Sequence, residues 1–334
     1  MLRLRLPSLA LGTALCALPL LLGACSSSSP GALGTSAQAA AAAPAPPTGR
    51  EAIGAAETQD DWGHTLQVIA NLRADPPDLP VVYLLGGSVA RECIVSEQSW
   101  AAAVADAGGP TALTYDLASS NRTTATDLKL VAAMPKVPTI VFIGVNVGRF
   151  TPAPSTPSVT LPAPSETVPP WEQHRYSDAR SVAAKESLLR GWLRTRYPLF
   201  KKHYAYNRGM LEKLVKACKA KGFRPVLLEL PRNTAVVKSR LDAPVARYHR
   251  SCKALAAEYR IPWVNFVGAA KLKNGDFHDL WHLIDPGRRK WQPLLAAKTA
   301  ALLKKYGMAT PSPSPTPSGS PVPAAPSPSG SPSP

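Results

Sequence analysis

Acidic residues and cysteines are scarce in this sequence. Its 334 residues include 22 Asp and Glu against 38 Lys and Arg, which gives a formal net charge of +16. The 5 cysteines form no CxxC pair, and no His-rich segment has the spacing of metal ligands. The usual zinc and iron–sulfur patterns are therefore excluded, and we expect no metal site.

The first 24 residues have the features of a targeting segment. Arg3 and Arg5 precede a mostly apolar run over residues 9–22, which is too short for a typical membrane-spanning helix. The run ends in the letters LGAC at residues 22–25, which resemble the bacterial lipobox, where cleavage precedes a cysteine that is then lipidated. We expect a signal peptide, lipidation of Cys25 and attachment to the extracytoplasmic face of the membrane. An ordinary secretion signal with an incidental cysteine is the alternative.

Composition divides the remaining chain into a central region and two low-complexity ends. Residues 25–58 are rich in Ser, Ala, Pro and Gly, and residues 308–334 consist almost entirely of these types. Neither end can bury enough apolar surface to fold, so we expect a tether and a solvated tail. Residues 59–307 then form one domain, with a proline-rich insertion over residues 151–170.

The basic residues are spread over predicted helices rather than gathered in one patch. Lys and Arg recur through residues 197–221 and 287–305. This distribution does not indicate a nucleic-acid partner, and it suits a position beside anionic envelope polymers or lipid head groups. Outside the cytoplasm we expect a disulfide between Cys218 and Cys252, on consecutive predicted helices, although sequence does not fix connectivity. Cys93 is then a small buried apolar residue.

Apolar, β-branched runs alternate with helical patterns through the central region. The runs predict strands at residues 81–85, 112–117, 139–143, 224–230 and 262–266. The helical patterns cover residues 62–71, 89–105, 125–134, 178–221, 243–259 and 287–306. The alternation predicts a three-layer α/β/α sandwich around a central, mostly parallel five-stranded sheet.

Polar residues follow the ends of the predicted strands. Ser88 comes after the first strand and a glycine pair, Asn121 after the second, and Asn146 after the third. His282 lies in the loop after the fifth strand. Because parallel strands end at one edge of the sheet, where ligands bind, we expect these four side chains to converge.

The residue types at this edge suit acyl transfer. Asp279 and His282 have Asp-x-x-His spacing, so the carboxylate can hold Nδ1 of the ring while Nε2 accepts a proton from Ser88. Asn146 can donate an amide N–H to the oxyanion. Simpler roles stay open at this stage: a helix cap for Ser88, a local hydrogen-bonded pair for Asp279 and His282, and a turn cap for Asn146.

Three short blocks, in this order, resemble the SGNH (GDSL-like) serine hydrolase family. Residues 86–88 (GGS) resemble its Gly-Asp-Ser block, residues 144–147 (GVNV) its Gly-x-Asn-Asp block, and residues 279–282 (DLWH) its Asp-x-x-His block. The resemblance extends over most of residues 81–306. It implies the flavodoxin-like SGNH fold and no need for an organic cofactor.

The resemblance also implies a role for each matching residue. Ser88 is the nucleophile, His282 the base and Asp279 the residue that orients it. Asn146 is an oxyanion donor, and Gly144 and Asn121 belong to the oxyanion or substrate-binding group.

Three departures from the family pattern bear on these roles. Gly87 and Val147 stand where the family has acids, and the loop with Ser120 and Asn121 stands where it has a donor glycine. These departures look like the envelope acyl-transfer branches of the family rather than its secreted lipases.

We therefore expect a lipid-anchored serine esterase or acyltransferase. Its partners are an acylated envelope glycan or small ester, and the membrane. A non-catalytic envelope binding or assembly lipoprotein that keeps the fold is the alternative. Arg91 and Arg149 lie near the predicted site, as holders of an anionic substrate or as solvated charges.

Overall fold

The computed structural model of the protein describes residues 61–170 and 175–308. The expected signal peptide, Cys25, the tether and all but the first residue of the expected tail lie outside these ranges. Within the described ranges, none of the helices has the length and apolar character needed to cross a bilayer.

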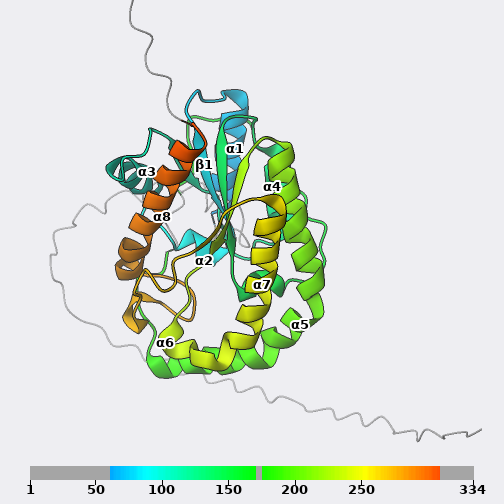
Figure 1. The fold of residues 1–334 in the computed structure, drawn as a ribbon, viewed down its shortest axis with the longest axis vertical. Coiled ribbons are helices and arrows are strands. Elements are labelled where there is room, and N and C mark those ends of the chain that lie inside the picture. Colours follow the sequence, from blue (N-terminus) through cyan, green and yellow to red (C-terminus); the bar gives the residue numbers. More distant parts are fainter. Residues whose placement is uncertain (1–60, 171–174, 309–334) are drawn as a thin grey trace, which may run out of the picture. The chain divides into compact units, whose positions relative to one another are not determined.

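Five strands form a parallel sheet at the centre of the fold (Figure 1). Their order across the sheet is β2-β1-β3-β4-β5, and all four pairings are parallel. The strands are β1 (Val81–Leu85), β2 (Leu113–Asp116), β3 (Thr139–Val145), β4 (Arg224–Glu229) and β5 (Trp263–Asn265). β1 and β3 are buried throughout, which explains their continuous apolar sequences. The expected sheet is confirmed, and it is wholly parallel.

Helices cover both faces of this sheet and complete the expected three layers. One apolar cluster joins the sheet to α1 (Trp62–Ala74), α4 (Thr124–Ala133), α5 (Val182–Ala220) and α7 (Asp242–Tyr259). A second cluster joins the other face to α2 (Ser88–Arg91), α3 (Glu97–Asp106) and α8 (Asp285–Lys305). Alternate residues of β1 enter the two clusters, as the pleat of a strand requires. Short elements complete the fold: η1 (Val147–Phe150), α6 (Thr234–Val237), η2 (Lys238–Leu241) and η3 (Asn274–Asp276).

The helix expected over residues 89–105 is instead two helices, α2 and α3. Glu92 follows α2, and its side chain is completely buried. Ser96 then begins α3 with a capping box, because its hydroxyl accepts the Ser99 N–H at 3.0 Å while the Ser99 hydroxyl accepts the Ser96 N–H. The prediction was wrong because a capping signal and a buried acid interrupt a pattern that is otherwise helical.

The proline-rich segment over residues 151–170 contains no helix or strand and lies along α1. Asn71 pairs with the backbone of Ser165, donating to its carbonyl at 2.6 Å and accepting from its N–H at 2.9 Å. Closer to the end of the segment, His64 Nδ1 lies 2.6 Å from the Pro169 carbonyl oxygen. The insertion is therefore a strap that α1 side chains hold in place.

Helix α5 is 39 residues long and contains Pro198. Proline lacks an N–H and clashes with the preceding turn, which accounts for the bend in α5 seen in Figure 1. Beyond the bend, Phe200 and Leu211 enter the core. Before it, Trp192 contacts the ring of Trp281. The bend thus lets one helix cover a face of the sheet and also reach the loop that precedes α8.

The expected disulfide between Cys218 and Cys252 is not formed. Both cysteines, and Cys93, are free and fully buried. Cys218 on α5 and Cys252 on α7 belong to the apolar cluster on one face of the sheet, where each thiol packs as a small hydrophobic group. The prediction relied on the two helices being consecutive along the chain, which does not determine whether their cysteines are bonded. Cys93 occupies a core position, as expected.

Candidate active site

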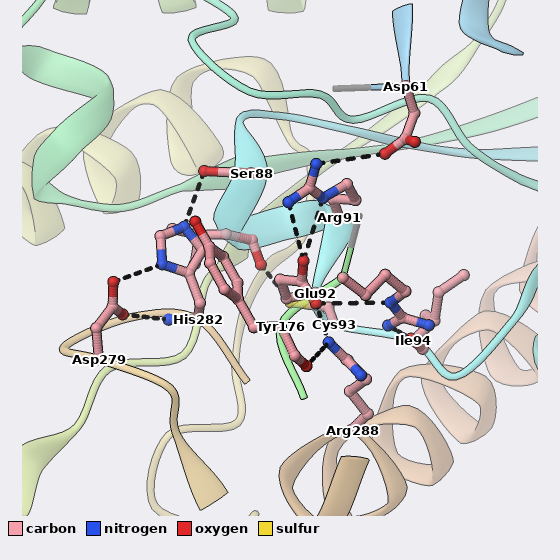
Figure 2. A network of polar contacts seen from close by, with 12 residues as sticks. Asp61, Ser88, Arg91, Glu92, Cys93, Ile94, Tyr176, Asp279, His282 and Arg288 are labelled. Atoms are coloured by element: carbon pink, nitrogen blue, oxygen red, sulfur yellow. Dashed lines mark hydrogen bonds and ion pairs between the residues drawn. The ribbon is translucent and has the colours of Figure 1, made fainter. Parts of the chain in front are cut away.

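Ser88, His282 and Asp279 form a hydrogen-bonded chain at the carboxyl edge of the sheet (Figure 2). Ser88 Oγ lies 2.8 Å from His282 Nε2, and His282 Nδ1 lies 2.8 Å from Asp279 Oδ2. A carboxylate can only accept, so Nδ1 carries the proton and Nε2 is the acceptor for the serine hydroxyl. This is the arrangement of a serine nucleophile, its base and the residue that orients the base.

The turn before α2 places Ser88 at the mouth of the sheet. The turn requires glycine at position 86, because the Cβ of any other residue there would lie 2.6 Å from the Cβ of Ala90. Gly87 precedes the helix in extended backbone, and its carbonyl accepts the Ala90 N–H at 2.9 Å. A Cβ on Gly87 would meet nothing closer than 3.9 Å, so this position does not require glycine sterically.

Asp279 is held ionised by its contacts. Its Oδ1 accepts the backbone N–H groups of Trp281 at 2.8 Å and His282 at 3.0 Å. Burial disfavours the charged carboxylate, but the His282 ring and these two N–H groups outweigh it, so the pKa of Asp279 lies well below its usual range. Asp279 can therefore stabilise the imidazolium that forms when His282 takes a proton.

Tyr176 packs against the imidazole of His282, a contact that the sequence did not indicate. Its ring centroid lies 4.8 Å from that of His282 and 4.1 Å from that of His278, on which it stacks. Burial raises the pKa of the Tyr176 hydroxyl. The aromatic packing limits rotation of His282 on the side away from Asp279.

Lys185 supports the loop that carries Asp279 and His282. Its ammonium group donates to the carbonyls of Asn274 at 2.9 Å and Phe277 at 2.7 Å, and its side chain is completely buried. Burial lowers the pKa of Lys185. The lysine comes from α5, about ninety residues earlier, and no local sequence pattern could have linked it to the site.

A buried glutamate ties the segment around Ser88 to two distant parts of the chain (Figure 2). Glu92 Oε1 accepts from Arg91 Nε at 3.1 Å, and Glu92 Oε2 accepts from Arg288. Arg175 Nε lies 3.5 Å from Oε2. Arg288 also donates to the carbonyl of Tyr176 at 2.8 Å. Arg91, one candidate for binding an anionic substrate, is thus committed to a buried carboxylate instead.

Comparison with known proteins gives distant structural neighbours. No family model matches the sequence, and no curated protein matches it. A carbohydrate esterase family 3 structure from Talaromyces cellulolyticus is 12% identical and covers 68% of this chain and 99% of that chain, with a TM-score of 0.41. A Lactobacillus plantarum protein is 13% identical and covers 68% and 97%, with a TM-score of 0.38.

A third similar structure, protein YxiM from Bacillus subtilis, is 13% identical with a TM-score of 0.38. That match covers 70% of this chain but only 58% of YxiM. The sheet order and the geometry of Ser88, His282 and Asp279 stand on the structure itself. The expected α/β/α fold is therefore present, and Ser88, His282 and Asp279 lie in the order in space that the resemblance implies.

Asn146, the expected oxyanion donor of an SGNH site, follows β3 and lies beside Ser88 in one pocket. Its Oδ1 accepts the Arg149 backbone N–H at 3.1 Å, which begins η1. That bond fixes the side-chain amide with its NH₂ group still available as a donor. The turn cap and the oxyanion donor, alternatives at the level of sequence, are therefore compatible.

Asn121 lies in the loop that was expected to stand in place of the family's donor glycine, and its backbone adopts the conformation that glycine favours. Its φ is +56°, in the left-handed region, and it lines the same pocket as Ser88. Asparagine enters this region more readily than most residues. The departure from the family pattern at this loop thus preserves a glycine-like backbone turn.

Gly144, expected among the oxyanion and substrate-binding residues, is required for packing and is not among the residues that line the Ser88 pocket. It lies within β3, opposite Leu228 of β4. A Cβ there would lie 2.9 Å from the Leu230 side chain and 3.0 Å from the Leu85 carbonyl oxygen. Glycine is needed at this position because neighbouring groups leave no room for a side chain.

The pocket next to Ser88 has a volume of about 350 Å³. The loop after β2, η1 and the first half of α5 form its walls. Its lining includes Ser88, Asn121, Asn146, Arg122, Arg149 and Arg196. Across residues 61–170 and 175–308, no three His, Cys, Asp or Glu side chains gather as metal ligands would.

Proposed function

We propose that this protein is a serine esterase or acyltransferase that works through an acyl-enzyme. The observation that carries the proposal is the chain of two 2.8 Å contacts from Ser88 through His282 to Asp279. Ser88 is partly exposed and opens onto a pocket, so an ester can reach it.

In the first half-reaction, Ser88 Oγ attacks the ester carbonyl carbon as its proton moves to His282 Nε2. The carbonyl oxygen becomes an oxyanion, to which the Asn146 amide donates. His282 then returns the proton to the departing alkoxide, the bond from the carbonyl carbon to that oxygen breaks, and Ser88 is left acylated.

The second half-reaction reverses these roles. Water, or the hydroxyl of a second sugar, attacks the acyl carbon while His282 takes its proton. Collapse of the tetrahedral intermediate returns that proton to Ser88 and releases the acid or the new ester. Hydrolysis and transfer therefore share every protein group and differ only in the acceptor.

The substrate that fits this proposal is a small acyl ester, such as an O-acyl group on an envelope glycan. A pocket of about 350 Å³ accommodates a short acyl chain better than a long one. Lipidation of Cys25 would hold the domain at the extracytoplasmic face of the membrane, within reach of such glycans.

Active-site labelling tests the proposal directly. A fluorophosphonate probe should label the wild-type protein and fail to label Ser88→Ala. Hydrolysis of 4-nitrophenyl acetate should fall at least about 10³-fold in Ser88→Ala and in His282→Ala. Ser96→Ala is the matched serine control, because Ser96 caps α3 and is not a triad residue.

Two results would contradict an enzymatic role for this site. One is equal labelling of the wild type and Ser88→Ala, and the other is hydrolysis that none of the substitutions changes. Either result would favour a non-catalytic envelope binding or assembly lipoprotein that keeps the fold.

A further inference from the structure

The pocket beside Ser88 is lined by basic side chains and by no acidic one. Arg122, Arg149 and Arg196 all contribute to its wall. The nearest balancing acid is Asp127, a buried residue of α4 that accepts a hydrogen bond from Arg149 and lies 3.9 Å from Arg122. Three arginines therefore contribute to the pocket wall, and one buried carboxylate lies close to two of them.

Two of these arginines already donate hydrogen bonds to other parts of the protein. Arg122 donates to Ser119 Oγ at 2.7 Å and to Thr65 Oγ1 at 3.0 Å, and its guanidinium lies 4.5 Å from the ring centre of Trp62. Arg149 donates to the carbonyl of Arg122. Both arginines are 6% exposed. Their positions in the wall follow from these contacts and do not require a ligand.

Arg196 differs from them in exposure and in partners. It is exposed, and with the described residues it forms no hydrogen bond or ion pair. It lies on the first half of α5, two residues before the bend at Pro198. That half of the helix is fixed to the site by the Lys185 hydrogen bonds and by the contact of Trp192 with Trp281. The first half of α5 thus holds Arg196, an exposed arginine without a partner among the described residues, in the wall of the Ser88 pocket.

We propose that Arg196 binds a carboxylate or phosphate group of the substrate, so that the protein prefers esters that carry a negative charge close to the acylated hydroxyl. The inference rests on the proposed function of Ser88. A guanidinium offers paired N–H donors that match the two oxygens of such an anion. With the carbonyl at Ser88 and Asn146, the charged part of the substrate lies along the arginine-lined wall.

Two esters with the same leaving-group skeleton test this proposal. One is 4-acetoxybenzoate, which is anionic, and the other is its neutral methyl ester. The ratio of their kcat/KM values is measured for the wild type, Arg196→Gln and Arg196→Lys. Arg194→Gln is the matched control, because Arg194 is an exposed arginine of the same helix that does not line the pocket.

We expect Arg196→Gln to lower the anionic-to-neutral ratio roughly tenfold, mainly through KM. Arg196→Lys should restore part of the ratio, and Arg194→Gln should leave it near the wild-type value. Inhibition of methyl-ester hydrolysis by benzoate and by inorganic phosphate distinguishes a carboxylate from a phosphate as the preferred anion. An unchanged ratio in Arg196→Gln, or an equal change in Arg194→Gln, would overturn the proposal.

A binding measurement separates this inference from the proposed catalysis. Calorimetry compares 4-hydroxybenzoate with methyl 4-hydroxybenzoate on wild type, Arg196→Gln and Arg194→Gln. Weaker binding of the anion in Arg196→Gln alone supports the anion site even if neither ester is hydrolysed. If Ser88 reacts with a fluorophosphonate but Arg196→Gln binds both compounds like the wild type, only the anion site is wrong.

Discussion

Asp279 contacts His282 with both carboxylate oxygens, Oδ2 at the ring Nδ1 and Oδ1 at the backbone N–H. One side chain therefore fixes both the loop conformation and the tautomer of the imidazole. Asp279→Asn presents an NH₂ group to Nδ1 or turns the amide away, and either change disturbs the tautomer in which Nε2 accepts. We expect kcat for 4-nitrophenyl acetate to fall by about 10⁴-fold.

Asp106→Asn is the control for this substitution, because Asp106 is an exposed residue of α3. It should leave kcat near the wild-type value, and circular dichroism should show both variants folded. A folded Asp279→Asn protein with kcat within a few-fold of the wild type would remove Asp279 from the mechanism.

Two substitutions of Asn146 can separate its role as the cap of η1 from its proposed role as an oxyanion donor. Asn146→Asp keeps an oxygen to accept the Arg149 N–H but loses the NH₂ donor. We expect kcat to fall by about 10² to 10³-fold while the melting temperature changes little. Asn146→Ala loses both functions and should also lower the melting temperature. If Asn146→Asp keeps nearly full activity, the oxyanion is stabilised by other groups.

The stability of the protein should depend on the ionisation of Asp279. Folding lowers the pKa of Asp279. The ionised carboxylate therefore contributes fully to the free energy of unfolding above the pKa of an aspartate in the unfolded chain, about 3.9, and this contribution is lost as the pH falls below that value. Urea unfolding at pH 7, 5, 4 and 3 measures the free energy of unfolding of the wild type and of Asp279→Asn. The difference between the two free energies should become smaller below about pH 4. A difference in the free energy of unfolding that does not change with pH would contradict the proposed dependence on Asp279 ionisation.

The buried thiols should be unreactive and unpaired. Burial raises the pKa of Cys218 to about 12, so very little thiolate is present at neutral pH. We expect the melting temperature to be unchanged by dithiothreitol, and unreduced peptide mapping to show Cys218 and Cys252 in separate peptides. A peptide in which Cys218 and Cys252 are linked, together with a lower melting temperature on reduction, would show that the disulfide forms.

Elements with strong local signals could be predicted from the sequence. Apolar runs placed the five strands to within a few residues. Ser88 just past the first strand, and His282 in the loop after the fifth, predicted the convergence of the two side chains. The break between α2 and α3 was missed partly because the Ser96 capping box was overlooked, and partly because Glu92 is held by arginines from three parts of the chain. Periodicity does not report on contacts of that kind.

The supporting residues of the site were the hardest to predict. Lys185 and Tyr176 have ordinary local surroundings in the sequence, and their roles come from contacts across 89 or more residues. Gly144 is a related case. Its place in the family motif suggested a part in the oxyanion or substrate-binding group, which stays a prediction, and only the structure shows that the Leu230 side chain leaves no room for a Cβ there.

The sequence separation of 194 residues from Ser88 to His282 sets an order of events during biosynthesis. At about 5 to 20 residues per second, roughly 10 to 40 seconds of translation separate the two side chains. Throughout that interval His282 has not been synthesised, so it cannot take the Ser88 proton. The proposed acyl-enzyme chemistry therefore waits until nearly the whole domain has been made.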